Sequence, residues 1–377
     1  CDLPIYAYAH DALAALCEKT GIPFAETQAG KSVLPWTHPL NLGGIGVTGG
    51  EAANIMARKA DVILAVGTRL SDFTTSSKWL FKENAKVIGL NICPFDAVKM
   101  DAEPMICDAR EGLTALTAAM EGYSYAHADE VKAAVTKWNA TVDGWYGAKS
   151  ELGLAQTRAL GIINEFMKEG DIAVGSAGSL PGDMQRLFRP TARDAYHMEY
   201  GFSNMGYETN GALGVKLACP DREVYTFFGD GTYLMAHSEL VTCVQEGLRV
   251  HFCLFDNSGW GCIENLQNNQ GSPTFGTVFR FRNCAGALRH NGRLDFFFDS
   301  GFVLCILSLI ESISAYSITD SIRVFEISCH KRGRFFFFHL RKTSCCHRID
   351  CMAVGRIKCK RLVFVDTTPL GTIFVLT

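Results

Sequence analysis

The sequence predicts an α/β fold made of two doubly wound parallel-sheet domains. Along residues 11–283, short and almost wholly apolar segments alternate with longer segments in which apolar residues recur at helical spacing. Short apolar runs bounded by glycine or polar loops are typical of strands that are buried on both faces of a parallel sheet. Alternation of such strands with helices covers both faces of the sheet, which is the doubly wound arrangement.

The first domain is predicted to span residues 1–123. Its expected helices are residues 11–21, 51–60 and 111–123, and its expected strands lie within residues 22–32, 61–72 and 85–92. Gly21 is expected to end the first helix, because glycine adopts the left-handed conformation that closes helices. The chain starts at Cys1 without a Met, so we expect this domain to be incomplete at its start. The polar, Ala/Lys-rich residues 124–152 are expected to form a partly helical connector.

The second domain is predicted to span residues 153–283. Its expected helices are residues 155–170, 184–188 and 234–247, and its expected strands are residues 171–175, 223–231 and 249–257. The loop after the first of these strands is Ser- and Gly-rich. This order again predicts parallel strands joined by helices.

The composition changes near residue 283. Residues 284–377 contain 13 Lys and Arg against 7 Asp and Glu, whereas the preceding residues contain 23 against 32. The same segment contains 7 of the 15 Cys and 11 of the 25 Phe, and its apolar blocks show no sustained helical or strand period. We interpret residues 284–377 as an aberrant Phe- and Cys-rich tail, such as a read-through or frame-shifted stretch. The alternative is a buried, Phe-rich extra domain.

The overall composition argues against two classes of partner. A net charge of −3 does not suit a nucleic-acid-binding protein, which needs a basic face. The longest apolar run, residues 302–310, falls short of the roughly 20 residues that span a bilayer, so no membrane segment is expected. The 15 Cys show no repeating spacing in a chain of 377 residues, which favours a reduced, cytoplasmic protein over a disulfide framework.

Two short polar motifs stand a fixed distance apart in the sequence. One is Asp230 between two glycines, and the other is the pair Asp256-Asn257. Twenty-four residues lie between Gly231 and Asp256. In a right-handed βαβ unit, a helix of about 14 residues, a strand of about 6 and two short turns fill such a gap. The spacing therefore predicts that Asp230 and Asn257 follow neighbouring parallel strands, at the sheet edge where such folds bind ligands.

These residues suit a divalent cation and a phosphate. Asp230 and Asn257 offer two hard oxygen ligands and the Gly259 carbonyl a third, and Mg²⁺ completes its octahedral shell with water and phosphate oxygens. Three further residues are candidates for contact with a diphosphate: Gly229, Gly231 and Thr232. Gly231 lets the backbone approach the phosphate, and Thr232 opens a helix whose N-terminus favours an anion. The alternative is that each motif is simply a tight turn.

The paired motifs resemble the signature of thiamin diphosphate enzymes, with Asp256 in place of the first Asn of that signature. The resemblance implies that Asp230, Asn257 and the Gly259 carbonyl bind Mg²⁺ and that the cofactor is thiamin diphosphate. Residues 201–214 are similar to the family segment whose Met supports the bent cofactor, which implies this role for Met205. In the same segment, Ser203 matches the position whose carbonyl meets the aminopyrimidine.

Residues 175–183 resemble the family loop on the other side of the diphosphate. The resemblance implies that Ser176 and Ser179 donate hydrogen bonds there. Each assignment has a structural alternative: Met205 is an ordinary core residue, and Ser179 with Asp183 caps the helix that follows.

Several longer segments are similar to the trihydroxycyclohexanedione hydrolases of inositol catabolism. They are residues 26–32, 41–49, 177–187, 196–208, 221–240 and 255–267. This resemblance implies hydrolysis of a C–C bond in a cyclic 1,2-dione, with 5-deoxyglucuronate as product, in a homodimer or homotetramer. The alternatives are another thiamin diphosphate enzyme, of the acetolactate-synthase or 2-oxo-acid-decarboxylase type, and a non-catalytic fragment.

The same family uses a Glu from a pyrimidine-binding domain to activate the cofactor. We expect that domain to lie outside this chain, so the catalytic acid or base is unknown and this fragment is expected to be inactive alone. A separate motif, Gly44-x-Gly46-x-x-Gly49, has the spelling of a dinucleotide-binding loop but follows no clear strand. We therefore do not expect an NAD site there.

Overall fold

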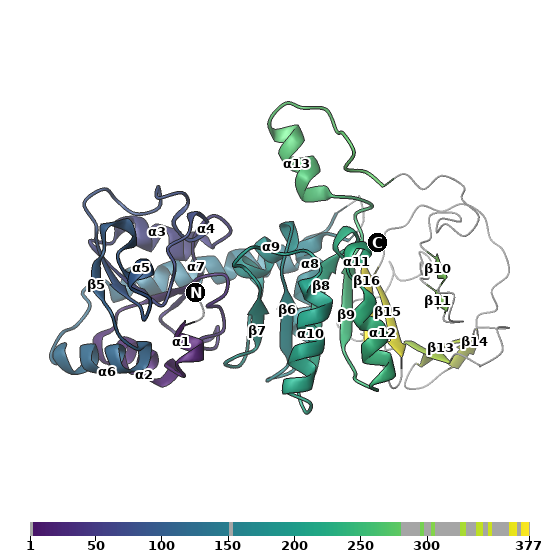
Figure 1. The fold of residues 1–377 in the computed structure, drawn as a ribbon, viewed down its shortest axis with the longest axis horizontal. Helices are drawn as coiled ribbons and strands as arrows, with labels where there is room; N and C mark the ends of the chain where they lie inside the picture. Colours follow the sequence, from purple (N-terminus) through teal and green to yellow (C-terminus); the bar gives the residue numbers. More distant parts are fainter. Residues whose placement is uncertain are drawn as a thin grey trace. The chain divides into compact units, whose positions relative to one another are not determined.

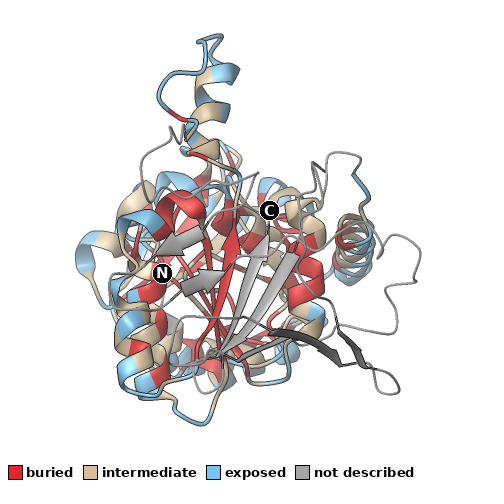
Figure 2. Cartoon of the chain, turned by 90° about the vertical axis from the view of Figure 1, so that its right-hand side faces the viewer, coloured by how far each residue is buried: buried red, intermediate tan, exposed pale blue. Residues whose placement is uncertain are grey.

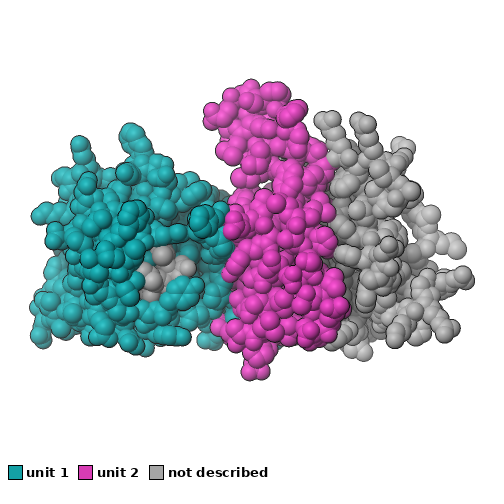
Figure 3. Space-filling view, viewed as in Figure 1, with its two compact units in different colours: residues 1–148, 160–172, 181–202 teal, residues 149–159, 173–180, 203–377 magenta. Residues whose placement is uncertain are grey.

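The computed structural model describes residues 3–150 and 154–279, together with the backbone of seven short strands between residues 295 and 376 (Figure 1). The chain forms two compact units, which Figure 3 shows in different colours. The first consists of residues 1–148, 160–172 and 181–202, and the second of residues 149–159, 173–180 and 203–377. Each unit contains parallel strands joined by helices, which confirms the predicted α/β class.

The first unit contains most of the short elements. Its helices are α1 (Leu3–Tyr6), α2 (His10–Thr20), α3 (Glu51–Lys59), α4 (Asp72–Thr75), α5 (Pro94–Ala97), the 3-10 helix η1 (Lys99–Asp101), α6 (Ala109–Ala119) and α7 (Ala128–Tyr146). Its strands are β1 (Phe24–Glu26), β2 (Asn41–Gly44), β3 (Val62–Val66), β4 (Lys86–Leu90), β5 (Glu103–Met105) and β7 (Tyr196–Met198). Helices α8 (Gln156–Phe166) and α9 (Ser179–Leu187) contribute residues to both units.

Strands β3, β4 and β5 form a parallel sheet in this order, and β1 pairs with β2 in parallel. Helices α2 and α6 pack together over the three-stranded sheet, where Leu16, Leu90 and Leu113 form part of one buried cluster. Gly21 ends α2 as predicted: its φ is 76°, and its N–H donates to the Cys17 carbonyl at 2.7 Å. The three helices and three strands assigned from the sequence are present as α2, α3, α6, β1, β3 and β4, whereas β2, β5 and the short helices α1, α4 and α5 were not predicted.

The connector is more regular than the sequence suggests. Residues 124–152 contain the 19-residue helix α7, which contacts α3 and β2 of the first unit. Four of its residues are buried, at intervals that place them on one face: Val131, Trp138, Val142 and Tyr146. Because this apolar face is narrow and most of the remaining residues are charged, polar or small, the segment looks like a polar linker by composition alone.

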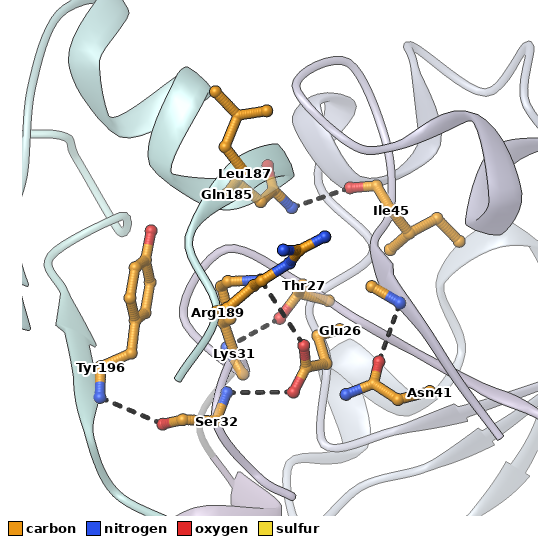
Figure 4. A network of polar contacts seen from close by, with 12 residues as sticks. Glu26, Thr27, Lys31, Ser32, Asn41, Ile45, Gln185, Leu187, Arg189 and Tyr196 are labelled. Carbon is orange, nitrogen blue, oxygen red and sulfur yellow. Dashed lines mark hydrogen bonds and ion pairs between the residues drawn. The ribbon is translucent and has the colours of Figure 1, made fainter. Parts of the chain in front are cut away.

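A buried polar network joins β1 and the following loop to the start of β7 (Figure 4). Ser32, with φ 73°, donates its N–H to Glu26 Oε1 at 3.0 Å, and its Oγ accepts from the Tyr196 N–H at 3.1 Å. Lys31 Nζ lies 3.8 Å from Glu26 Oε2. Burial raises the pKa of Glu26 and lowers the pKa of Lys31, and their mutual attraction opposes both shifts. The network fixes the loop that follows β1.

The second unit is built on a parallel sheet in which β8 (Val224–Gly229) lies between β6 (Ile172–Gly175) and β9 (His251–Phe255). Every residue of β6 and β9 is buried, and Figure 2 shows the buried residues concentrated along the sheet. The remaining helices of the unit are α10 (Tyr207–Ala218), α11 (Asp230–Met235), α12 (Ser238–Gln245) and α13 (Gly261–Asn269). The complete burial of these strands explains their near-continuous apolar sequences.

Two predicted helices differ from the structure. The helix expected at residues 234–247 is two helices, α11 and α12, separated by Ala236 in an extended conformation (φ −153°, ψ 94°). The Ala236 carbonyl accepts a hydrogen bond from Thr209 Oγ1 at 2.7 Å, a contact between distant segments that holds the break. Helix α9 begins at Ser179, five residues before the start predicted at Met184.

The predictions for residues 284–377 fall largely outside the described residues. The strands given there by their backbone are β10 (Asp295–Phe297), β11 (Val303–Cys305), β12 (Phe325–Ser328), β13 (Phe337–Arg341), β14 (Cys346–Arg348), β15 (Leu362–Thr367) and β16 (Gly371–Leu376). Of these, β16 pairs in parallel with β9 and antiparallel with β15. Among the helices of the described residues, none has the length and hydropathy needed to cross a membrane.

Candidate cofactor and metal site

The two sequence motifs meet at one edge of the second unit's sheet. Strands β8 and β9 are parallel and in register, with Gly229 opposite Phe255, so Asp230 and Asp256 leave neighbouring strand ends. Asp230 is buried, and its Oδ2 accepts a hydrogen bond from the Gly259 N–H at 3.1 Å. Its Oδ1 accepts from the Gly231 N–H at 3.0 Å. The spacing argument from the sequence is therefore confirmed for these two loops.

Two carboxyl groups are adjacent at this edge. Burial, followed by the hydrogen bond and the charge of Asp256, raises the pKa of Asp230 to about 7. Asp256 is itself held by the Ser258 N–H, which donates to its Oδ1 at 2.7 Å. Two such carboxyl groups cannot both ionise without a cost, and a proton or a cation between them removes it.

The loop after β9 is pinned by a segment further along the chain. Trp260 donates its N–H to the Thr277 carbonyl at 2.7 Å. A Cβ on Gly259 would lie 2.2 Å from that same carbonyl oxygen, so only glycine fits there. Asn257 is exposed, and a Cβ on Gly261 would lie 2.5 Å from its Nδ2. Glycines on either side of Trp260 thus let the loop close against Thr277 and the Asn257 side chain.

The residues at this edge fit a divalent cation in their chemistry. Asp230 offers carboxylate oxygens, Asn257 an amide oxygen on the exposed side, and Gly259 a backbone carbonyl, all hard donors of the kind that Mg²⁺ prefers. Burial first, and then the neighbouring Asp256, raise the pKa of Asp230, and a bound cation would replace the proton that the buried carboxyl group retains. The donor set therefore agrees with the predicted metal ligands.

Gly231 is needed for a reason that the sequence did not reveal. A Cβ at this position would lie 2.6 Å from the indole ring of Trp260, so the ring covers the side of Gly231 where a side chain would stand. Thr232 is buried as the third residue of α11, which begins at Asp230 with Gly229 as its N-cap. The expectation that Thr232 opens the helix is therefore wrong by two residues, because the turn after β8 is tighter than predicted.

The second pair of loops consists of the loop after β6 and the loop before α10. Ser176 is buried, and its Oγ donates to the Asn204 carbonyl at 2.7 Å. Ser203, with φ 56°, donates from its Oγ to the Ser176 carbonyl at a longer 3.4 Å. The structure thus brings Ser176 and Ser203 together and uses the Ser176 hydroxyl to hold the Ser203 loop.

The other two predicted residues of these loops differ in exposure. Met205 is half-buried and precedes Gly206, whose φ of 97° makes glycine the suitable residue. Ser179 is exposed and is the first residue of α9, directly after Gly178. Its hydroxyl is therefore placed on the accessible side of the loop, and its assignment as a hydrogen-bond donor to a diphosphate stays a prediction.

Sequence reasoning missed the residues that support these loops. Glu208 is 1 % exposed, and Thr226 donates from its Oγ1 to the Glu208 carbonyl at 2.8 Å. Trp260 covers Gly231. The available signal for Glu208 was the single carboxylate of α10, close to the start of the helix, but its position in the sequence does not show what it contacts.

The glycine-rich loop of the first unit does not have the properties of a dinucleotide site. A Cβ on Gly46 would lie 2.0 Å from the Phe73 carbonyl oxygen, and one on Gly49 would lie 2.5 Å from the Gly44 carbonyl oxygen. The Gly46 N–H donates to Asn54 Oδ1 at 2.9 Å, and the Gly49 N–H donates to the Gly46 carbonyl at 3.0 Å. These glycines allow the chain to pack on itself, and their N–H groups are already used.

Two protein-family models match the chain. The model described as thiamine pyrophosphate enzyme, central domain, matches residues 5–116. The model described as thiamine pyrophosphate enzyme, C-terminal TPP binding domain, matches residues 176–293. Together they cover more than half of the chain, and the second includes the loops of Asp230, Asn257 and Ser176.

Three curated relatives have the same name, one of them with the number 2 added. The chain is 47 % identical over 313 residues to the 3D-(3,5/4)-trihydroxycyclohexane-1,2-dione hydrolase of Geobacillus thermodenitrificans, and 44 % identical over 317 residues to that of Clostridium tetani, covering 77 % of this chain and 48 % of each relative. A Bacillus cereus relative of the same name is 46 % identical over 305 residues, covering 74 % of this chain and 47 % of the relative. The chain thus spans about half the length of these relatives. On the two domain matches and this identity, the chain belongs to the thiamine pyrophosphate enzyme family.

Proposed function

We propose that this chain provides the central and diphosphate-binding domains of a thiamin diphosphate- and Mg²⁺-dependent hydrolase that opens trihydroxycyclohexane-1,2-dione to 5-deoxyglucuronate in inositol catabolism. The observation that carries the proposal is the 44–47 % identity to relatives with this name, over about three quarters of the chain. The meeting of the Asp230 and Asn257 loops at one sheet edge supports it independently.

The metal is assigned to Asp230, Asn257 and the Gly259 carbonyl, and the diphosphate to the adjoining backbone around Gly229, Gly231 and Thr232. When bound, thiamin diphosphate supplies an electron sink for carbanion chemistry, which no protein side chain provides. The chain's own part is to bind and orient. Asp230 is buried, so the attraction between its ionised carboxylate and a bound cation would be screened less by water than at the surface.

The other side of the cofactor is assigned to the paired loops of Ser176 and Ser203. Their mutual hydrogen bonds set the spacing of the segment that carries Met205, the residue proposed to support the cofactor. Ser179 is proposed to donate to the diphosphate from the accessible start of α9. These assignments place the two predicted groups of cofactor ligands on loops that follow β6 and β8 and precede α10.

The shared name of the relatives favours the dione hydrolase over an acetolactate-synthase or decarboxylase type of activity. We place the activity in the cytoplasm, which is supported by free thiols in the described residues, among them the buried Cys17, Cys243 and Cys253. Homodimeric or homotetrameric assembly stays a prediction.

Product analysis tests the proposed reaction. The protein that carries this chain, in the form its cells make, is incubated with Mg²⁺ and thiamin diphosphate and with either the cyclic dione or pyruvate. We expect the dione to be consumed and a ring-opened acid to form whose mass exceeds that of the dione by one water. Turnover of pyruvate without turnover of the dione would assign the protein to the other branch of the family.

A further inference from the structure

A buried carboxylate connects the loop after β6 to the loop before α10. Glu208 accepts hydrogen bonds on both of its side-chain oxygens. The Ala177 N–H donates to its Oε1 at 3.2 Å, and the Gly206 N–H donates to its Oε2 at 2.9 Å. With a residue exposure of 1 %, the carboxylate is shielded from solvent. The two donors belong to segments about thirty residues apart, and each lies next to a residue assigned to the cofactor site.

The backbone carbonyl of Glu208 makes a separate contact with the sheet. Thr226 in the buried strand β8 donates from its Oγ1 to the Glu208 carbonyl at 2.8 Å. Gly206, the N-cap of α10, packs against Ala236, since a Cβ there would lie 2.6 Å from the Ala236 Cβ. The side-chain oxygens of Glu208 contact the two loops and its carbonyl contacts β8, so a displacement of the side-chain oxygens would displace both loops.

Both oxygens of one side chain take part in this connection. Hydrogen bonds from backbone N–H groups to a carboxylate are stronger than those to a neutral acceptor. Loss of the acceptor would leave the N–H groups of Ala177 and Gly206 buried without a partner, which destabilises the arrangement of both loops. The contact between Ser176 Oγ and the Asn204 carbonyl connects the same two segments but supplies only one further short bond.

We propose that Glu208 is a positioning residue of the thiamin diphosphate site: its carboxylate sets the separation between the Ser176–Ala177 segment and the Ser203–Gly206 segment. This inference rests on the cofactor binding proposed above. Glu208 does not need to touch the cofactor, because it acts through the backbone of both loops. Ser203 and Met205 then keep their places when the cofactor enters, so less order has to be gained on binding.

The test compares Glu208→Gln with the control Thr226→Val. The Gln side chain has nearly the same shape, but it presents an NH₂ group, a donor, to one of the two backbone N–H donors. Thr226→Val removes the hydrogen bond to the Glu208 carbonyl from the other side and leaves both loop contacts intact. For each protein, thermal unfolding reports stability, and calorimetry with saturating Mg²⁺ reports the affinity of the folded protein for thiamin diphosphate.

We expect Glu208→Gln to weaken thiamin diphosphate binding on the order of tenfold, since a tenfold change in Kd corresponds to about 1.4 kcal/mol. Thr226→Val should change this affinity much less, even if it lowers the unfolding temperature by as much as Glu208→Gln does. Binding of Mg²⁺ alone should be unchanged in Glu208→Gln, because the metal loops follow β8 and β9 and do not include Ala177 or Gly206. Should Glu208→Gln not fold, Glu208→Asp carries the same test, with the charge kept and the reach shortened.

Three results would overturn the inference. Equal affinities in the parent and Glu208→Gln would show that the loops do not depend on the carboxylate. Equal losses in Glu208→Gln and Thr226→Val would show that Glu208 serves only folding. Absence of thiamin diphosphate binding by the parent protein would refute the proposed cofactor together with this role, whereas the first two results leave the cofactor assignment standing.

Discussion

The N–H of Gly259 donates to the buried Oδ2 of Asp230 at 3.1 Å, which joins the loop after β9 to the loop after β8. The two residues are 29 positions apart in the chain. The parallel register of β8 and β9 makes this contact possible, because both strands end at the same edge of the sheet. The hydrogen bond therefore fixes the loops of the candidate metal ligands relative to each other.

Asp256→Asn is expected to stabilise the metal-free protein above pH 7. The folded pKa of Asp230, about 7, lies above the ordinary value of 3.8, so the folded state retains a proton that the unfolded state has lost. Stability should therefore fall as the pH rises from about 4 to about 7. Removal of the Asp256 carboxyl group lowers the pKa of Asp230. Each pKa unit by which it falls adds about 1.4 kcal/mol to the free energy of unfolding above pH 7.

The measurement is urea unfolding in EDTA between pH 5 and 8. The Asn side chain still offers an oxygen to the Ser258 N–H, so the loop keeps that hydrogen bond. We expect the variant to gain about 1 kcal/mol or more over the parent at pH 8 and little at pH 5. A gain of the same size at both pH values would contradict the shared-proton explanation.

Gly231→Ala is expected to destabilise the second unit, because the new Cβ would lie 2.6 Å from the Trp260 ring. Overpacking of this kind costs roughly 1–3 kcal/mol. Gly214→Ala is the matched control: this exposed glycine lies inside α10 with no atom within 4 Å of an added Cβ. It should stabilise the protein by about 0.5–1 kcal/mol, because alanine is the better helix former. Thermal unfolding of both variants decides the matter, and equal shifts would show that Trp260 does not cover Gly231.

The cysteines are expected to differ in their reaction with iodoacetamide at pH 8. Burial, with a smaller contribution from Glu18, raises the pKa of Cys17 to about 12, and burial raises the pKa of Cys253 well above its ordinary value. The thiolate is the reactive form, so these two thiols should stay unmodified in the folded protein. Among the cysteines of the described residues, the half-buried ones should be modified before these two: Cys93, Cys107, Cys219 and Cys262. Peptide mapping by mass spectrometry measures this order, and early modification of Cys253 would contradict the buried position of β9.

The parts of the fold that depend on local pattern were predictable. The apolar strands β6, β8 and β9 and the closure of α2 by Gly21 follow from composition and spacing, because full burial and left-handed glycine leave a direct signal in the sequence. The approach of Asp230 to the loop of Asn257 was predictable for the same reason, since a βαβ unit fixes the length of the chain between two strand ends.

The parts that depend on contacts between distant segments were not predictable. The break at Ala236 is held by Thr209, and Gly231 is glycine because Trp260 lies over it. Glu208 gains its importance from Ala177, which is 31 positions away. No local pattern encodes such pairs. The sequence therefore predicts one continuous helix across Ala236, and it does not indicate that Glu208 is buried and hydrogen-bonded.

The central claim is that Asp230 anchors a metal through which this chain binds thiamin diphosphate. Calorimetric titration of thiamin diphosphate into the protein, with Mg²⁺ and with EDTA, tests it most directly when repeated on Asp230→Asn and on the control Asp221→Asn. Asp221 is exposed in the same unit, so its replacement removes the same charge away from the site. We predict binding that requires Mg²⁺, weakened on the order of tenfold or more in Asp230→Asn, since a charged ligand is lost, and unchanged in Asp221→Asn. Binding of equal strength in EDTA, or in Asp230→Asn, would contradict the account.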